Sequence, residues 1–510
     1  MTTQTVKKVL IVGGGSAGWL CAAWLAKLLG AVEISLVEAP EIGAIGVGEG
    51  SFPSLRSTLA ALGIEEARFV RECSATFKQG ISFRNWIKGD DEYFHPFSMP
   101  SQRPGAPELL PYWLQGMAGD TPFAAAVTMQ QHVVQAMRGP KRAHDPDFMG
   151  PMNYGYHFDA VRFAALLADH ARSLGVHHLQ GHVEGATLNE DGAIASVQTR
   201  EHGALTADLY IDCSGFRALL IGGALGAPFR SVSDTLFCDT ALAVQVPYPS
   251  ANSPIASATI STAHEAGWTW DIGLHERRGI GYVYSSRHTS DERAEQVLRA
   301  YAGPASAGLP LRKIPMRVGY REQQWIGNCV AVGLSAGFLE PLEASGIGLV
   351  ETAVHMIGAL FPHNGEMAPV ARHFNHFMRE RYARIVDFIK LHYCLSRRME
   401  RFWIDNADPA SMPDSLRDKL AMWRCRPPQR MDFLTDLEMY PPTSWQYVLY
   451  GMGFPKALPD SPGLAAHAEA ARQEFANLAR VSRAAVDDLP QHRRLVHELC
   501  GNLRLKSFSA

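Results

Sequence analysis

The sequence predicts an α/β fold built around a parallel sheet. Three observations lead to this prediction: a strand, glycine turn, helix and second strand open the chain; apolar strands that end in glycine recur far downstream; and alternating apolar and polar positions fill the region between them. The 510 residues exceed what one ordinary core holds, so we expect two closely packed domains or one large composite fold.

Composition narrows the class of protein. The formal net charge is −3, so no basic excess attracts nucleic acid or an anionic membrane. We find no apolar run of about 18 residues that could span a bilayer, and no secretory signal before the first strand. None of the 8 cysteines forms a Cys-x-x-Cys pair and the histidines lack metal-ligand spacing. We therefore expect a cytoplasmic protein without a disulfide framework or a bound metal.

The chain opens with one complete strand–helix–strand unit. Val9–Val12 predicts a buried strand, and Trp19–Leu29 predicts a helix that Gly30 stops. A second strand follows over Val32–Val37 and ends at Glu38. This succession is the first βαβ unit of a nucleotide-binding domain.

A Gly-x-Gly-x-x-Gly turn joins the first strand to the helix. Its three glycines permit, in order, the tight turn, the approach of the backbone to a pyrophosphate, and the close packing of helix on strand. Phosphates would lie at the helix N-terminus, where N–H groups and the helix dipole favour anions, and the carboxylate that ends the second strand would accept from ribose hydroxyls. The alternative is a glycine-rich turn without a ligand. The residues expected to bind the cofactor are Gly13, Gly15, Ser16, Ala17, Gly18 and Glu38.

Further strands and helices typical of a nucleotide-binding domain are predicted far along the chain. We expect a helix over residues 157–174 and a strand over 178–188. Strands near 209–212 and 328–332 each run into a glycine turn, at Gly215 and Gly333. A late strand, turn and helix that return to the nucleotide domain favour FAD over NAD.

The other regions have different patterns. Residues 235–290 alternate apolar and polar positions, as antiparallel strands do, whereas 365–510 read as mostly helical. The Pro/Gly-rich stretch 96–122 predicts a loop. We therefore expect a discontinuous FAD-binding domain of the glutathione-reductase-like Rossmann type, with an inserted antiparallel sheet and a mainly helical C-terminal substrate region. The expected parts are 1–90, 150–235 and 310–365 for the FAD-binding domain, 91–149 and 236–309 for the sheet and substrate region, and 366–510 for the helical region that covers the substrate.

Five segments carry motifs that point to one family. They are Gly46–Pro53, Phe77–Ile81, Gly267–Ile272, Glu340–Ile347 and Ser444–Gly453. All five resemble segments of the flavin-dependent tryptophan halogenases. The first resembles the strap between the flavin and substrate sites, the second the surroundings of a catalytic lysine, and the third a Trp-x-Trp-x-Ile-Pro signature. The fourth resembles the surroundings of a catalytic glutamate, and the fifth a C-terminal segment. Within that family the chain is most similar to the indole-brominating members.

The resemblance implies an enzyme that uses FADH2, O2 and halide. A separate flavin reductase would supply the FADH2, and the hypohalous acid formed would pass along an internal tunnel to a lysine beside an indole-type substrate. Bromide would be the preferred halide, because Gly273 in place of the family's proline implies a looser tunnel wall and bromide is easier to oxidise than chloride. Beyond the glycine turn, the resemblance adds Gly48, Glu49, Val183, Leu334 and Ile347 to the FAD contacts.

Lys78 and Glu343 are the expected catalytic residues. Lys78 lies in an apolar stretch, where a partly buried ammonium could hydrogen-bond hypohalous acid and make the halogen more electrophilic; the alternative is a solvated surface lysine. Glu343 lies just ahead of a predicted helix and could accept the ring proton, although the helix dipole alone favours a carboxylate there and Glu340 is a nearby competitor. The backbone of Ser345 and Gly346 would bind the halide.

Two tryptophans are expected to line the tunnel. Trp268 and Trp270 would keep the aromatic substrate away from the flavin; the alternative is an ordinary strand with two core aromatics on one face. Gly273 stands where the family has proline, and Ala344 stands where it often has a hydroxylated residue. Both departures affect residues next to the expected reaction path.

Aromatic residues are expected to hold the substrate. His95 and Phe97 would sandwich an indole ring, unless they merely pack in a loop, and Trp445 and Tyr447 would close over it. We find no match for the acidic residue that holds an amino acid's ammonium group. The sequence therefore favours indole, a simple indole derivative or a larger indole-bearing substrate over free tryptophan.

Two rival functions stay open. A flavin-dependent aromatic monooxygenase (hydroxylase) would share the FAD site but would have no use for the set of Lys78, Glu343 and the paired tryptophans. A degenerate relative that only binds flavin or indole is the second rival. The oligomeric state is also open, with a homodimer as one option.

Overall fold

The computed structural model describes residues 5–40, 48–101, 103–455 and 462–501. The chain divides into two units, each made of three separate segments. The first unit contains Met1–Ser74, Phe158–Ser233 and Met316–Ala383, and the second contains Ala75–His157, Asp234–Pro315 and Arg384–Ala510. These bounds differ from the expected FAD-binding segments, because 75–90, 150–157, 234–235 and 310–315 lie in the second unit and 366–383 lie in the first. The assignment of FAD binding to one unit stays a prediction.

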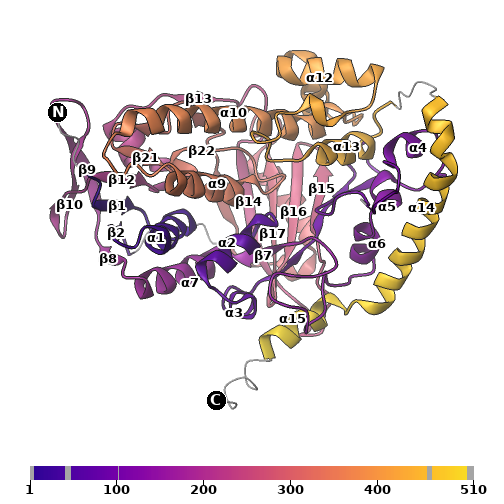
Figure 1. Ribbon diagram of the computed structural model, residues 1–510, viewed down its shortest axis with the longest axis horizontal. Helices are drawn as coiled ribbons and strands as arrows, with labels where there is room; N and C mark the ends of the chain where they lie inside the picture. The colour runs from indigo at the N-terminus through magenta and orange to yellow at the C-terminus, as the bar shows by residue number, and fades with distance from the viewer. Residues whose placement is uncertain (1–4, 41–47, 102, 456–461, 502–510) are drawn as a thin grey trace. The chain divides into compact units, whose positions relative to one another are not determined.

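A mostly parallel sheet forms the centre of the first unit. Within the described residues its six strands are β1 (Lys8–Val12), β2 (Glu33–Glu38), β8 (His177–Gln180), β12 (Leu209–Asp212), β20 (Trp325–Ile326) and β21 (Cys329–Ala331). Their spatial order is β20-β21-β12-β1-β2-β8, and the strands from β21 to β8 are parallel whereas β20 runs antiparallel (Figure 1). The predicted α/β fold on a parallel sheet is confirmed.

Helices and turns connect these strands. They include α1 (Ser16–Leu29), α2 (Ser54–Leu62), α3 (Glu66–Glu72), η1 (Gly215–Arg217), η2 (Leu219–Ala224), η4 (Gly333–Ser335), α9 (Ser345–Ala359) and the first part of α10 (Met367–Cys394). Helix α1 contacts α9 and α7 (Ala160–Ser173). The helix predicted over 157–174 begins only at residue 160, because the Asp159 side chain caps it by accepting from the N–H groups of Val161 and Arg162.

Two small antiparallel sheets belong to the same unit. One contains β9 (Val183–Leu188), β10 (Ile194–Thr199) and β11 (Gly203–Leu205), and the other contains β13 (Phe229–Ser231), β19 (Gly319–Arg321) and β22 (Gly337–Phe338). The single strand predicted over 178–188 is therefore two strands in different sheets. The chain leaves β8 at Gly181, whose N–H group donates to the carbonyl of Glu38 over 2.8 Å, and then enters β9.

A large, mainly antiparallel sheet forms the centre of the second unit. Its seven strands in the described chain are β5 (Gly80–Arg84), β6 (Glu92–Pro96), β14 (Thr240–Pro247), β15 (Thr259–His264), β16 (Gly267–Gly273), β17 (Arg277–Tyr284) and β18 (Arg312–Pro315). The order is β18-β14-β17-β16-β15-β5-β6, with β15 and β5 parallel. The strands predicted over 235–290 are confirmed. A short strand β4 (Thr76–Lys78) pairs antiparallel with β7 (Gly155–Asp159).

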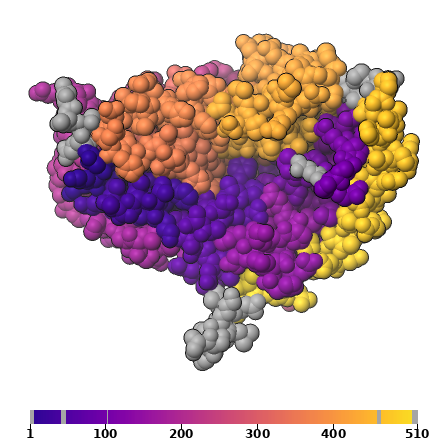
Figure 2. All heavy atoms as spheres, in the orientation of Figure 1, coloured from indigo at the N-terminus to yellow at the C-terminus, as the bar shows by residue number. Residues whose placement is uncertain are grey.

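Helices cover much of the second unit. They include the last part of α10, together with α4 (Leu110–Leu114), α5 (Phe123–Val127), α6 (Gln130–Gln135), α8 (Asp291–Ala302), α11 (Arg401–Ala407), α12 (Asp414–Cys425), α13 (Pro442–Gly451), α14 (Pro462–Asp488) and α15 (His492–Gly501). Helix α14 runs along α4, α5 and α6, and its yellow surface borders their violet one in Figure 2. The predicted helical region is confirmed, whereas the predicted loop over 96–122 contains α4. None of the helices in the described part of the chain is long and apolar enough to cross a membrane.

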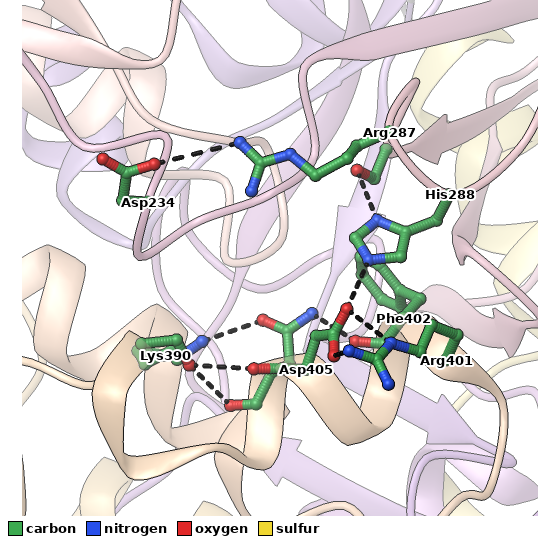
Figure 3. A network of polar contacts seen from close by, with 10 residues as sticks. Asp234, Arg287, His288, Lys390, Arg401, Phe402 and Asp405 are labelled. Carbon is green, nitrogen blue, oxygen red and sulfur yellow. Dashed lines mark hydrogen bonds and ion pairs between the residues drawn. The ribbon is translucent and has the colours of Figure 1, made fainter.

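A polar network fixes α11 within the second unit (Figure 3). His288, which follows β17, places Nε2 at 3.1 Å from a carboxylate oxygen of Asp405 on α11. Lys390 of α10 donates to Asn406 Oδ1 over 2.9 Å and to the carbonyl of Thr235 over 3.0 Å. The buried Lys390 ammonium therefore has polar partners on two different segments, as a buried charge needs.

Two glycines of the first turn provide a matched test of packing. A Cβ at Gly18 would lie 1.9 Å from the Gly13 carbonyl oxygen, whereas a Cβ at Gly15 would meet none of the described atoms within 4 Å. We expect Gly18→Ala to lower the melting temperature of the ligand-free protein by roughly 1–3 °C, since overpacking costs about 1–3 kcal/mol and a chain of this length shifts by about 1 °C per kcal/mol. Gly15→Ala should leave it unchanged. Calorimetry that finds equal losses in both variants would contradict this packing.

Candidate active site

Glycine turns follow three neighbouring parallel strands of the first unit. Strands β21, β12 and β1 are adjacent, so their carboxyl ends share one edge of the sheet, where α/β proteins bind nucleotides. The turns approach one another closely: a Cβ at Gly13 would lie 2.3 Å from the Cys213 carbonyl oxygen, and one at Gly333 would lie 2.9 Å from the Cβ of Ala17. Larger residues at Gly13 and Gly333 would force these turns apart.

The N-terminus of α1 can hold a phosphate. The helix begins at Ser16, three residues earlier than predicted, so Ser16 and Ala17 belong to its first turn. Gly15 caps the helix in an extended conformation, and among the described residues no side chain caps its N–H groups. Open space around Gly15 and uncapped N–H groups are what an anion at a helix N-terminus needs. These residues therefore fit the pyrophosphate of a dinucleotide.

Glu38 lies at the same edge of the sheet, at the end of β2. Its carboxylate passes over Gly14, where an added Cβ would lie 1.6 Å from Oε2, and Oε1 lies 2.9 Å from Nε2 of His178 on β8. Burial raises the pKa of Glu38, while the nearby His178 ring opposes this rise. His178 thus orients the carboxylate that is expected to accept from a ribose.

The other expected FAD contacts also lie in the first unit. Gly48 and Glu49 form part of β3 (Gly48–Gly50), while Gly46 and Val47 of the expected strap lie outside the described residues. Burial raises the pKa of Glu49, and the charge of Asp159 adds to this rise. The remaining contacts are Val183 at the start of β9, Leu334 in η4 and Ile347 in the first turn of α9.

The start of α9 carries the expected halide and proton sites. Helix α9 begins at Ser345, so Glu343 lies just ahead of it, as predicted. Glu343 and Ser345 are buried, and Gly346 is exposed. The cap between them, Ala344, has left-handed angles of φ 55° and ψ 36°, a conformation that costs an alanine roughly 1–2 kcal/mol. The backbone at this departure from the family pattern is therefore strained.

A second buried carboxylate lies on α9. Glu351 accepts hydrogen bonds from Ser54 Oγ at 2.8 Å and from Thr58 Oγ1 at 2.6 Å, both on α2. Burial raises the pKa of Glu351 to about 7, although these two hydrogen bonds oppose the rise. The sequence analysis missed this residue, and the signal was a lone acidic residue inside the apolar run of α9.

The raised pKa of Glu351 makes stability depend on pH. The folded protein holds this proton more tightly than the unfolded chain, whose carboxyl has an ordinary pKa of 4.5, so the carboxylate destabilises the fold above pH 7. That penalty disappears as the pH falls towards 4.5. We expect Glu351→Gln to raise the melting temperature by roughly 3 °C at about pH 8.5 and to leave it nearly unchanged at about pH 5, since the rise of the pKa from 4.5 to about 7 corresponds to roughly 3 kcal/mol. Thermal scans that show the same difference at both pH values would refute this.

Lys78 is buried in the second unit, so the alternative of a solvated surface lysine is wrong. It ends β4, and its Nζ lies 5.2 Å from the centre of the Phe97 ring. The Phe97 N–H group donates to the carbonyl of Gln79 over 3.1 Å, and the Gln79 N–H group donates to the carbonyl of Ser257 over 2.8 Å. Gln79, which follows Lys78 and bonds to Phe97, therefore keeps the ammonium close to the aromatic ring.

His95 and Tyr447 also come together in the second unit. His95 lies on β6 with its Nε2 at 2.8 Å from Ser444 Oγ, and its ring centre lies 6.2 Å from that of Tyr447. The Tyr447 hydroxyl donates to the carbonyl of Ser98, next to Phe97, over 3.1 Å. Three of the four residues expected to hold the substrate thus belong to one connected group.

Trp445 is not part of the group formed by His95, Phe97 and Tyr447. Its side chain is fully buried between Phe388, Trp423 and Phe433, at ring-centre distances of 5.0, 5.7 and 5.6 Å. Trp445 and Tyr447 are two residues apart on α13, so helical periodicity directs them to different faces. The structure does not bring Trp445 to the other expected substrate residues.

Further aromatic residues join the group around Tyr447. Phe123 of α5 lies 5.5 Å from Tyr447 and 5.1 Å from Trp113 of α4, and Trp113 lies 5.5 Å from Tyr450. Trp113 was not expected here because the stretch 96–122 was predicted to be a loop, and Phe123 directly follows that stretch. The overlooked signal was the run of large apolar residues from Leu109 to Leu114.

Trp268 and Trp270 project from the same face of β16. Their ring centres lie 6.5 Å apart, and both are largely buried, with 1% and 8% of their surface exposed. The Trp270 ring lies directly over Gly281, where an added Cβ would approach it to 2.1 Å. A Cβ at Gly273 would lie 2.7 Å from a methyl group of Ile255. Neighbouring side chains therefore fill the space that the proline ring of the family signature would occupy.

The fold defines a mixed α/β protein with a Rossmann-like parallel-sheet core and an inserted antiparallel sheet. The family profile described as tryptophan halogenase matches residues 8–468. Tryptophan 6-halogenase SttH of Streptomyces toxytricini is 36% identical over 96% of this chain and 98% of its own. The solved tryptophan halogenase of Shewanella frigidimarina is 40% identical, with a TM-score of 0.94 over 98% of this chain and 99% of its own.

A second solved relative carries a more specific description. Tar14, a tryptophan C-6 flavin-dependent halogenase (chlorinase) from taromycin biosynthesis, is 36% identical with a TM-score of 0.90 over 97% of this chain and 99% of its own. This chain belongs to the tryptophan halogenase family of flavin-dependent enzymes.

Proposed function

We propose that this protein is an FADH2-dependent halogenase that acts on an indole-type substrate. The observation that carries the proposal is a buried lysine beside an aromatic ring, in a chain of the tryptophan halogenase family. Family membership disfavours the aromatic monooxygenase (hydroxylase) alternative. The matched relatives are described as halogenases, which disfavours a relative that only binds flavin.

The first unit would hold the cofactor. Its phosphates would lie against the N–H groups of Ser16 and Ala17, and Glu38, oriented by His178, would accept from a ribose. Bound FADH2 supplies, together with O2, the two-electron oxidation that turns halide into hypohalous acid. The backbone N–H groups of Ser345 and Gly346, at the start of α9, would bind the halide.

Lys78 would activate the hypohalous acid. Its ammonium donates a hydrogen bond to the oxygen, which draws electrons from the halogen and makes it a better electrophile. The ring carbon then bonds to the halogen while the bond between halogen and oxygen breaks, and the oxygen takes a proton from the Lys78 ammonium and leaves as water. Glu343 would accept the proton that the same ring carbon loses. Trp268 and Trp270 would keep the ring from the flavin.

The proposed substrate rests on a group of aromatic side chains in the second unit. Phe97, His95 and Tyr447 form a connected aromatic group that suits an indole. Trp445 would act only through Phe388, whose ring lies 5.0 Å from that of Trp445 and 5.8 Å from that of His95. Relatives are described as acting on tryptophan, and one as a chlorinase, whereas we propose an indole or indole-bearing substrate and bromide. A separate flavin reductase would supply FADH2, and a homodimer is one possible assembly.

Substitution of Lys78 tests the central role. We expect Lys78→Ala to lower halogenated product at least about 100-fold, the usual effect of losing a positioned acid, while FAD affinity stays within about twofold. Product would be measured by mass spectrometry with indole and tryptophan, bromide or chloride, FAD and an added reductase. Wild-type levels of halogenated product in this variant would remove Lys78 from the mechanism.

A pair of neighbouring carboxylates tests the proton acceptor. Glu340 and Glu343 are both buried ahead of α9, so Glu340→Gln is the matched control for Glu343→Gln. We expect Glu343→Gln to lower kcat by about 100-fold with little change in KM, and Glu340→Gln to keep kcat within about threefold. The opposite ranking in steady-state kinetics would transfer the role to Glu340.

A further inference from the structure

Strand β4 forms a hydrogen bond with a histidine near the C-terminal end of the chain. On one side β4 pairs with β7, with Phe77 opposite Tyr156. The N–H group of Phe77, the residue before Lys78, donates to Nε2 of His492 over 3.0 Å. His492 is the first residue of α15 and is fully buried. A side-chain nitrogen thus takes the place that a carbonyl of a neighbouring strand would occupy.

This contact fixes the protonation of His492. An N–H group can only donate, so Nε2 of His492 must carry its lone pair and not a proton. The other ring nitrogen, Nδ1, lies 3.1 Å from the carbonyl of Ile255 and therefore carries the hydrogen that it donates. Burial lowers the pKa of His492 to about 4, which agrees with a neutral ring.

The position of the ring is set independently of β4. The His492 N–H group donates to the carbonyl of Met137 over 2.9 Å, and the Gly139 N–H group donates to the carbonyl of Pro490 over 2.9 Å. The start of α15 is therefore attached at three points to segments other than β4. Such a ring can hold β4 in place instead of following its movements.

We propose that His492 is a positioning residue for Lys78: its Nε2 holds the Phe77 N–H group and thereby fixes the direction in which the Lys78 side chain leaves β4. Successive side chains of a strand point to opposite faces, so a rotated peptide at Phe77 would redirect Lys78. His492 lies beyond residues 8–468, which the family profile matches. The inference rests on the proposed role of Lys78.

The two nitrogens of His492 can be tested separately. In His492→Gln the amide oxygen can reach the place of Nε2 and accept from Phe77, whereas in His492→Asn the amide nitrogen can reach the place of Nδ1 and donate to Ile255. His497, exposed on the same helix, provides the control His497→Asn. Each variant would be assayed with FADH2, bromide, indole and a soluble thioether that traps escaping hypobromous acid.

The decisive measurement is how the hypobromous acid divides between indole and thioether, because a merely structural role of His492 would not change this ratio. We expect His492→Asn to shift the ratio of brominated indole to oxidised thioether about tenfold towards the thioether, because the reaction loses its fixed ammonium, with total oxidation unchanged. His492→Gln should stay within about threefold of the wild type, and His497→Asn should equal it. Hydrogen exchange of the Phe77 amide should rise in His492→Asn alone.

Two results would overturn the inference. One is faster exchange at Phe77 in His492→Asn with the wild-type partition, which would make the contact structural only. The other is equal loss in the Gln and Asn variants. Lys78→Ala, assayed alongside, distinguishes failure of the proposed function from failure of this inference. If that variant still brominates indole as the wild type does, the proposed function fails. The exchange data still report whether His492 holds Phe77.

Discussion

The hydrogen bonds on either side of Lys78 are the constraint on which the proposed chemistry depends. The Phe77 N–H group is held by the His492 ring and the Gln79 N–H group by the carbonyl of Ser257, so the backbone around the lysine has two fixed points. The Gln79 carbonyl in turn accepts from Phe97, whose ring lies 5.2 Å from the ammonium. A buried cation in a fixed direction can polarise one bond of a bound reactant, which a mobile surface lysine cannot do.

The first unit offers backbone N–H groups, which suit the anionic groups of the expected cofactor and the expected halide. Its glycine turns converge at the carboxyl edge of a parallel sheet, and the starts of α1 and α9 expose backbone N–H groups. The strained Ala344 sits between Glu343 and Ser345, so it sets the turn that separates the expected proton acceptor from the expected halide site. Glu351, deeper in α9, attaches this helix to α2 through two hydroxyl groups.

Local signals in the sequence predicted most of the fold and part of the candidate site. The βαβ unit, the strands of residues 235–290 and the position of Glu343 ahead of a helix follow from short-range patterns, and all three agree with the structure. Trp445 could not be separated from Tyr447 until the bounds of α13 were known. His492 could not be found at all, because its contact with Phe77 spans 415 residues of sequence and neither residue belongs to a motif at that spacing.

Regioselectivity tests the central claim most directly, namely that a fixed lysine delivers the halogen to the ring. The measurement compares the ring positions brominated by the wild-type enzyme with those brominated by hypobromous acid added to the same indole without protein. If Lys78 directs the reaction, one ring position should dominate the enzymatic product and the two distributions should differ. Identical distributions would show that the acid reacts in solution and that the geometry around Lys78 does not control the chemistry.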